Sequence, residues 1–253
     1  MPFTFSHPAA VVPLARSLPA SALIIGSIVP DLGYYVPLPW DALWMHTPAG
    51  SVRADLACGI AAYALWWWVV VPAGAEILPA AWRRRITTSR PQLGARRMIA
   101  VVTALYVGTL THIVWDAMTH DWMWGPAHLP WLNRQWGPLP IYDWLQSISS
   151  VGGLVIVFLW WRTWWKRPPS PEPIAGALPV RTRCLSWTVI ATSAICGCVS
   201  GVATADEGRL VDIAFTAYTR GITGMLVGFA MVCAALWLRR WSMAARERAT
   251  MED

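Results

Sequence analysis

The sequence predicts an all-α, polytopic membrane protein: a bundle of about five spanning helices with an N-terminal re-entrant or broken helical hairpin. Apolar residues make up 56% of the chain and charged residues only 13%, which is about half the charged share of a soluble domain. Several apolar stretches reach the roughly 20 residues that a spanning helix needs. The chain also carries 19 tryptophans, a residue that is enriched where a membrane meets water.

Five apolar stretches are predicted to span the membrane as helices, because in lipid a helix satisfies all of its own backbone polar groups. They are Leu56–Leu78, Met98–Met118, about Ser147 to Trp161 with an extension to Trp165, Cys184–Ala203, and Ile213–Leu238. The last of them contains Arg220.

The stretch from Pro8 to Pro30 is apolar but does not resemble a straight span. Pro13 and Pro19 interrupt it, and Arg16 lies near its middle. A proline inside a helix is unfavourable by about 3 kcal/mol, and an arginine within the bilayer is also unfavourable. A single span is the alternative, but we expect two short helices that fold back on each other as a re-entrant hairpin.

Basic residues gather in alternate connections between the predicted spans. They are Arg83, Arg84, Arg85, Arg90, Arg96 and Arg97 in the first such connection, Arg162, Lys166, Arg167, Arg181 and Arg183 in the next, and Arg239, Arg240, Arg246 and Arg248 in the tail. The connections Thr119–Leu145 and Thr204–Asp212 hold only Arg134 and Arg209. The positive-inside rule therefore predicts a multi-pass protein of the cytoplasmic (inner) membrane, with a cytoplasmic C-terminus and the Thr119–Leu145 loop outside.

The run from Lys166 to Pro179 is rich in proline, which predicts a non-helical linker. We therefore expect three parts along the chain. Residues 1–165 form a membrane domain that carries the candidate site, residues 166–183 a cytoplasmic linker, and residues 184–253 a C-terminal helix pair with a basic tail.

Charge and cysteine content exclude two classes of protein. The net charge of +6 does not indicate nucleic-acid binding, because the basic residues lie between apolar spans rather than along one face. The five cysteines lie within or at the edges of apolar stretches. They are therefore predicted to be small hydrophobic side chains and not a disulfide framework.

The segment GTLTHIVWDAMTH, Gly108–His120, places ionisable side chains in a predicted span, where their high energetic cost indicates function. His112, Asp116 and His120 recur every four residues. Each such step turns the helix about 40° beyond a full turn, so His112 and Asp116 share a face and His120 lies somewhat aside. Imidazole and carboxylate on one face form half of a site for zinc or a similar divalent metal. The alternative is a buried His–Asp hydrogen bond that fixes helix packing without metal.

Further ligands are available near the same end of the predicted bundle. His7 precedes the broken apolar stretch, Asp31 follows it, and His46 precedes the first predicted span. If the stretch is a hairpin, all three residues emerge on the outer side, at the depth of His112 and Asp116. Nitrogen and oxygen ligands from three parts of the chain would then converge on one metal. Taken singly, His7 and Asp31 could instead be helix caps, and His46 a loop residue.

The motifs PFTFSHPAAVVPL, SIVPDLGYYVP, MHTPAG and LTHIVWDAMTH resemble an uncharacterised bacterial membrane family, a domain-of-unknown-function family that opens with PFTFSHPA. Their pattern is similar to that of the YdjM-like inner-membrane metal-dependent hydrolases and, more distantly, of zinc-dependent phospholipase C. The resemblance covers residues 1 to about 153. It implies metal ligation by His7, Asp31, His46, His112 and Asp116, with His120 as a further candidate. The second histidine–glutamate pair of the phospholipases is not found, which argues against their full three-metal site.

These features predict a membrane-embedded, metal-dependent hydrolase at the outer face of the cytoplasmic membrane, with zinc as the expected divalent metal. A membrane lipid or lipid-linked phosphoester is the expected substrate, because the site would open at headgroup depth. The alternative is a non-enzymatic transporter or partner subunit, in which the histidines and aspartates bind an ion or relay protons. The sequence leaves the general base and the oligomeric state open.

Overall fold

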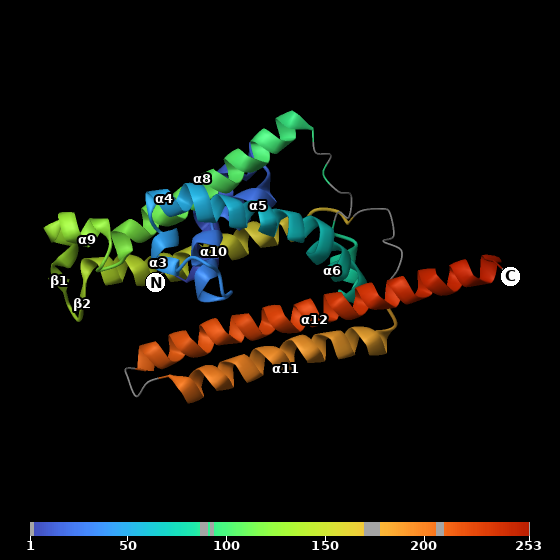
Figure 1. Cartoon of the computed structure of the whole chain (residues 1–253). Helices are drawn as coiled ribbons and strands as arrows, with labels where there is room; N and C mark the ends of the chain where they lie inside the picture. The colour runs from blue at the N-terminus through green and yellow to red at the C-terminus, as the bar shows by residue number, and fades with distance from the viewer. Residues whose placement is uncertain (1–2, 87–90, 92–93, 170–177, 206–209, 253) are drawn as a thin grey trace. The chain divides into compact units, whose positions relative to one another are not determined.

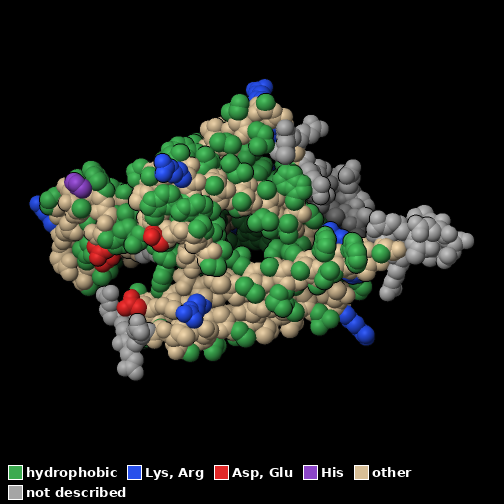
Figure 2. Space-filling view, in the orientation of Figure 1, with side chains coloured by type: hydrophobic (Ala, Val, Ile, Leu, Met, Phe, Trp, Pro, Cys, Tyr) green, Lys and Arg blue, Asp and Glu red, His purple; other side chains and the backbone are tan. Residues whose placement is uncertain are grey.

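Helices that could cross a membrane dominate the computed structural model, which describes residues 3–86, 91, 94–169, 178–205 and 210–252. Within these residues, five helices are long and apolar enough to do so: Pro48–Ile77, Ala95–Thr119, Ile141–Trp165, Val180–Thr204 and Leu210–Ser242. Hydrophobic side chains are spread over the face shown in Figure 2, as suits a surface in contact with lipid. The predicted all-α, multi-pass membrane protein is confirmed.

The chain divides into two compact units. The first comprises Met1–Leu65 and Pro91–Pro168, and the second comprises Trp66–Arg90 and Pro169–Asp253. The first spanning helix therefore begins in one unit and ends in the other. Residues 170–177 of the predicted linker lie outside the described residues. Every residue of the predicted site falls in the first unit.

The spanning helices extend beyond the apolar stretches that predicted them. Helix α10 (Ile141–Trp165) begins before Ser147, and α11 (Val180–Thr204) begins before Cys184. Asp143 lies in the first turn of α10, where an acidic side chain is favoured by the helix dipole. Because such polar first turns lower the local hydropathy, a search for apolar stretches places these helix starts too late.

The first spanning helix is not a regular α-helix throughout. It consists of α4 (Pro48–Gly50), a π-helical turn η4 (Ser51–Asp55), α5 (Leu56–Leu65), a second π-helical turn η5 (Trp66–Val70), and α6 (Val71–Ile77). Pro72 accounts for the second π-helical turn, because it has no N–H to donate and its ring would clash with the carbonyl group of Trp68. The helix widens there to avoid both problems.

The N-terminal segment is a broken hairpin of short helices, as predicted. Its elements are the 3₁₀ turn η1 (Thr4–Ser6), α1 (Pro8–Val11), the 3₁₀ turn η2 (Val12–Arg16), α2 (Ala20–Gly26) and the 3₁₀ turn η3 (Val29–Tyr34). Pro13 lies in the first turn of η2 and Pro19 directly precedes α2. At both positions the missing backbone N–H is tolerated.

The hairpin lies along α8 (Ala95–Thr119). Its tip, Arg16–Pro19, lines a cleft together with Gly94–Arg97 at the start of α8. The two ends of the hairpin lie near the other end of α8, where His7 approaches Asp116 and Asp31 approaches His112. Both ends of the hairpin therefore lie towards the same end of α8.

Glycines allow α2 and α8 to pack backbone against backbone. A Cβ atom at Gly26 would collide with the carbonyl group of Leu105, and one at Gly108 would collide with that of Leu23. Small residues are commonly found at such close contacts between membrane helices. The hydroxyl group of Thr109 donates a hydrogen bond to the Gly26 carbonyl oxygen (3.3 Å). This contact fixes the hairpin against the helix that carries His112 and Asp116.

A short, partly non-helical segment connects α8 to α10. It contains α9 (Trp124–His128), the 3₁₀ turn η6 (Pro130–Asn133), and the strands β1 (Gln135–Trp136) and β2 (Leu139–Pro140). Figure 1 shows α9 and the two strands together at one end of α8 and α10. The strands pair antiparallel, with Trp136 opposite Leu139, and Gly137 turns the chain with a φ of 65° that glycine adopts without strain. This β-hairpin was not predicted from the sequence.

The second unit is built on α11 and α12 (Leu210–Glu252), which run antiparallel along each other (Figure 1). Close glycine contacts again allow this, because a Cβ atom at Gly201 would lie 2.6 Å from Cα of Ala217. Helix α6 and the short α7 (Ala80–Arg83) belong to the same unit. The Trp187 indole donates a hydrogen bond to the Ile77 carbonyl oxygen (3.1 Å), and the Arg240 guanidinium pairs with Glu76.

Candidate metal centre

Four buried side chains from three elements converge in the first unit. They are Asp31 in η3, His46 at the C-terminal end of α3 (Ala42–Met45), and His112 and Asp116 on one face of α8. Each offers a nitrogen or oxygen atom, and these atoms all lie within 4.8 Å of one another. No side chain of the four is more than 5% exposed. The group could hold a metal ion.

The spacing of the four donor atoms suits a tetrahedral metal. The Nε2 atoms of His46 and His112 lie 3.2 Å apart, and both lie 3.5 Å from Asp31 Oδ1. Asp116 Oδ2 lies 3.4 Å from the first nitrogen and 3.3 Å from the second. Donor atoms bound about 2.0–2.1 Å from a tetrahedral ion are themselves about 3.3–3.4 Å apart. The four residues therefore fit such an ion in chemistry and in spacing.

The outer nitrogens of the two rings are held by the backbone. Nδ1 of His46 lies 2.7 Å from the Ala42 carbonyl oxygen, and Nδ1 of His112 lies 2.8 Å from that of Ser27. A carbonyl oxygen only accepts, so each Nδ1 carries a proton and donates it. In the neutral form that binds a metal, each ring would then direct the lone pair of Nε2 into the cluster, which is the usual arrangement of metal-binding histidines.

Two helix caps place His46 in this position. The Asp41 carboxylate accepts a hydrogen bond from the Trp44 backbone N–H (2.6 Å) and starts α3. The Thr47 hydroxyl oxygen accepts one from the Gly50 N–H (3.0 Å) and starts α4. Such caps stabilise helix starts by about 1 kcal/mol each. His46 therefore lies in a short bend that is fixed on both sides.

The cluster favours positive charge. Burial opposes protonation of His46, but the carboxylates of Asp116 and Asp31 outweigh it and raise the pKa of this histidine to about 9. Two carboxylates in a buried site need a compensating cation. A proton on His46 supplies one such charge, and a divalent metal at the centre of the four donor atoms would supply more.

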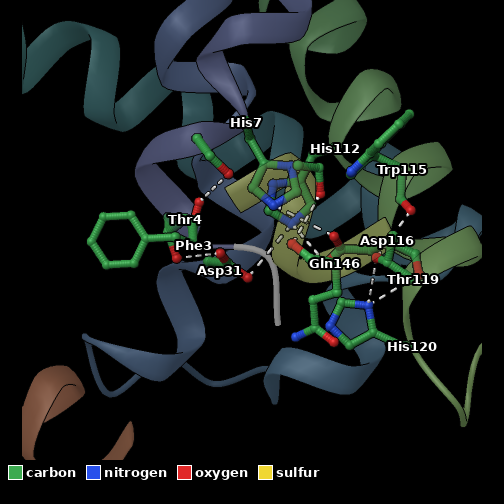
Figure 3. Close-up of polar contacts among 12 residues, drawn as sticks. Phe3, Thr4, His7, Asp31, His112, Trp115, Asp116, Thr119, His120 and Gln146 are labelled. Carbon is green, nitrogen blue, oxygen red and sulfur yellow. Dashed lines mark hydrogen bonds and ion pairs between the residues drawn. The ribbon is translucent and has the colours of Figure 1, made fainter. Parts of the chain in front are cut away.

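Thr4 and Tyr35 hold the Asp31 carboxylate in place. The Thr4 hydroxyl group donates to Asp31 Oδ2 (2.5 Å) and, because its single proton is used there, accepts from the Tyr35 hydroxyl group (2.6 Å). Among the described residues, the other oxygen, Asp31 Oδ1, has no hydrogen-bond partner and is the atom that faces the cluster. Figure 3 shows Thr4 on the side of Asp31 away from the α8 residues.

We expect Thr4→Val to weaken metal binding while the protein stays folded. The change keeps the side-chain shape but removes the hydrogen bond to Asp31, and losing such a supporting partner typically lowers metal affinity about 10–100-fold. Competition with a coloured chelator would measure it. Thr111→Val is the matched control, because the Thr111 hydroxyl group donates only to the carbonyl oxygen of Gly108 on its own helix. Equal affinities in the two variants would contradict this role of Thr4.

His7, predicted as a ligand, lies beside the four residues rather than among them. Its ring stacks on that of His112 at 3.7 Å between ring centres, and its Nε2 atom lies 3.4 Å from Asp116 Oδ1. Burial, and then the neighbouring His112, lower the pKa of His7 to about 3, so its ring is neutral. In the described part of the chain, neither His7 Nε2 nor Asp116 Oδ1 has a hydrogen-bond partner. His7 is thus available as a fifth donor.

His120, the remaining predicted ligand, lies at the C-terminal end of α8. Its Nδ1 atom is 3.0 Å from the Asp116 carbonyl oxygen and 3.2 Å from the Thr119 hydroxyl oxygen, and its ring meets Trp122 edge-on. Figure 3 shows it set apart from the stacked rings of His7 and His112. The structure therefore places His120 to one side of the cluster, as its position on the helix suggested.

Asp55 is a candidate residue that the sequence analysis missed. It is 1% exposed, and neither oxygen of its carboxyl group has a hydrogen-bond partner among the residues that the structure describes. It closes the π-helical turn η4, which packs against the elements that carry Asp31, His46 and His112. Burying a carboxyl group without a partner is strongly unfavourable. The charge that His46 and His112 can carry offsets part of this penalty.

Comparison with known proteins assigns the chain to a family. The model of a domain of unknown function (DUF4184) matches residues 1–236, so the chain belongs to this family. No curated protein and no solved structure matches it. The predicted membership of a domain-of-unknown-function family is therefore confirmed, whereas the likeness to metal-dependent hydrolases and phospholipase C is supported by the motifs alone.

Proposed function

We propose that this member of the DUF4184 family is a membrane-embedded, metal-dependent hydrolase that acts on a lipid-linked phosphoester at the outer face of the cytoplasmic membrane. The observation that supports it best is the meeting of the His46 and His112 Nε2 atoms, 3.2 Å apart, between two carboxylates. With both rings neutral the two Nε2 lone pairs would face each other, so a proton or a metal ion must lie between them. We propose zinc as the metal, because it binds histidine nitrogens and carboxylate oxygens and the four donor atoms lie at tetrahedral spacing; a water molecule would then take a fifth position or displace one carboxylate.

The chemistry follows from this donor set. When bound, such a metal polarises a phosphoryl oxygen and lowers the pKa of a water molecule towards neutrality. Asp31, His46, His112 and Asp116 would hold it, and the backbone carbonyl groups of Ala42 and Ser27 keep both imidazoles in the binding tautomer. Asp55 is a buried carboxyl group close enough to His46 and His112 to interact with them, and it could accept a proton from attacking water.

The reaction class and the lipid substrate rest on separate arguments. The motifs that carry the four residues are similar to those of the YdjM-like inner-membrane hydrolases, which favours hydrolysis. His112 and Asp116 lie in the C-terminal half of the spanning helix α8. The segment that follows this helix is rich in exposed tryptophan: Trp124 is 57% and Trp136 is 68% exposed. Tryptophan prefers the headgroup region of a membrane. A lipid headgroup would therefore meet the metal centre at its own depth.

The proposed orientation places this segment outside and the C-terminus in the cytoplasm, because of the alternating basic connections. Three of the candidate spans, α10, α11 and α12, lie between Arg134 and Asp253. We expect an alkaline phosphatase fusion to be active near Arg134 and inactive at Asp253, and a green fluorescent protein fusion to show the reverse. The same signal at both positions would contradict the topology.

Metal analysis and a phosphate-release assay together test the function. Protein purified in detergent without chelator should carry about one divalent ion per chain, as expected of a site with four donors. It should release phosphate from micellar phosphatidic acid or a polyprenyl diphosphate, and a chelator should stop this until zinc is restored. Bound metal without hydrolysis of either lipid would favour the non-enzymatic alternative, a transporter or partner subunit with an ion site.

A further inference from the structure

An apolar pocket of about 410 Å³ adjoins the metal centre within the first unit. Its walls come from the start of the hairpin, from α8 and from one face of α10. Its lining includes His7, Ala10, Trp115, Ile148 and Gly152. A volume of this size is typical of a site for a small organic ligand. Nearly all of the lining is apolar or small, and His7 is its one ionisable side chain.

The pocket lies within membrane-spanning helices and is open towards their lipid-facing side. Trp115 belongs to the span Ala95–Thr119, and Ile148 to the span Ile141–Trp165. These two residues are 43% and 61% exposed, although they line the pocket. In a bilayer, hydrocarbon surrounds such surfaces. A hydrocarbon chain can therefore enter from the membrane without crossing water.

His7 joins the pocket to the metal centre. Its side chain lines the pocket on one side, and on the other its Nε2 atom lies 3.4 Å from Asp116 Oδ1 and its ring stacks on His112. A second apolar cavity, of about 180 Å³, lies along the same hairpin and α10 but is not lined by His7. Only the larger of these two would place a bound molecule next to the candidate ligands.

We propose that this pocket binds one hydrocarbon chain of a lipid substrate and so positions the adjoining phosphoester at the metal centre. The inference rests on the proposed function and deepens it, because it assigns the substrate to lipids with a long apolar chain. It also assigns a role to Gly152. A Cβ atom there would meet no other atom within 4 Å, so this glycine leaves the pocket open and is not required by helix packing.

The test compares two substitutions on α10. Gly152→Leu should fill the pocket without disturbing the fold, because its Cβ atom meets no other atom within 4 Å and position 152 lines the pocket. Val151→Phe is the matched control: it adds bulk at the next residue, whose side chain is 66% exposed and does not line the pocket. The metal content and the thermal unfolding of both variants should equal those of the wild type.

The probe is a phosphatidic acid with a photoreactive diazirine in its acyl chain, incorporated with the protein into nanodiscs. Irradiation and peptide mapping should show labelling at Ala9–Ala10 and at Ile148–Ile156 above the labelling of lipid-exposed residues of α12, which measures bulk lipid. Bulk added to a tight apolar pocket changes binding about tenfold or more. Gly152→Leu should therefore reduce the pocket labelling to the bulk level, while Val151→Phe leaves it unchanged.

Labelling at the bulk level in the wild type, or equal labelling in both variants, would overturn the pocket proposal whatever the metal content. A crosslink from the pocket residues to a second protein chain, in place of lipid labelling, would overturn it as well. The two proposals fail separately. Pocket labelling in a protein that binds no metal would support the lipid pocket and refute the hydrolase, whereas full metal occupancy with an unlabelled pocket would refute the pocket alone.

Discussion

Asp116→Asn should remove the metal from the purified protein. The substitution keeps the size of the side chain but removes the negative charge that lies 3.3 Å and 3.4 Å from the two Nε2 atoms. Changes to supporting residues lower metal affinity about 10–100-fold, so we expect the loss of a direct ligand to exceed about 100-fold. Metal analysis after dialysis against a weak chelator would measure it. Activity on a lipid phosphoester should fall in parallel.

Asp143→Asn is the control for this experiment. It is the same chemical change on the same unit, in the first turn of α10 and outside the group of four. It should keep the metal of the wild type. Full occupancy in Asp116→Asn would show that the four residues do not form the metal site. A wild-type protein without metal, purified with its normal helix content, would favour a buried proton-binding or packing cluster instead.

Gly108→Ala should destabilise the protein and loosen the metal centre together. The new Cβ atom would collide with the Leu23 carbonyl group and lie 2.7 Å from the Ser27 backbone nitrogen. These are backbone atoms, so α2 must move away from α8. Overpacking of this kind typically costs about 1–3 kcal/mol, which corresponds to a fall in Tm of roughly 5 °C. Because the Ser27 carbonyl oxygen holds His112, metal affinity should fall as well.

Gly152→Ala provides the comparison, since an added Cβ atom there meets nothing within 4 Å. Its unfolding temperature in detergent and its metal affinity should match those of the wild type. If Gly108→Ala behaved in the same way, the close contact between α2 and α8 would not be what positions His112.

The spans and the hairpin could be predicted because the bilayer imposes simple rules. A spanning helix needs a minimum length of apolar chain, and proline interrupts it. These rules located all five spans and the broken segment that contains Pro13 and Pro19. They do not determine where a helix starts in polar sequence, which is why α10 begins at Ile141 rather than near Ser147.

The convergence of Asp31, His46, His112 and Asp116 could also be predicted, because two of them share a helix face and a hairpin returns the others to the same level. The contacts that hold these side chains in place could not be predicted. The bond from Thr4 to Asp31 joins two 3₁₀ turns across the hairpin, and helical periodicity carries no information about such a contact.

Asp55 was missed for a related reason. In the sequence it is the last charge before an apolar stretch, SVRADLACGI, where a polar flanking residue is expected. The π-helical turn that ends at Asp55 shifts the register of the helix. A regular helix pattern therefore could not show that this carboxyl group turns inward.

The hairpin also constrains the order of events during synthesis. His7, Asp31 and His46 leave the ribosome before α8, and His46 and His112 are separated by 66 positions along the chain. The helices α1 and α2 of the hairpin, with 4 and 7 residues, are too short to cross the bilayer, and their backbone ends need a neighbouring helix to cover them. Its stable insertion must therefore wait until α8 has left the translocon and offers Gly108 as a contact surface. If the four residues bind a metal, its loading would then have to follow translation of the second of the five spans.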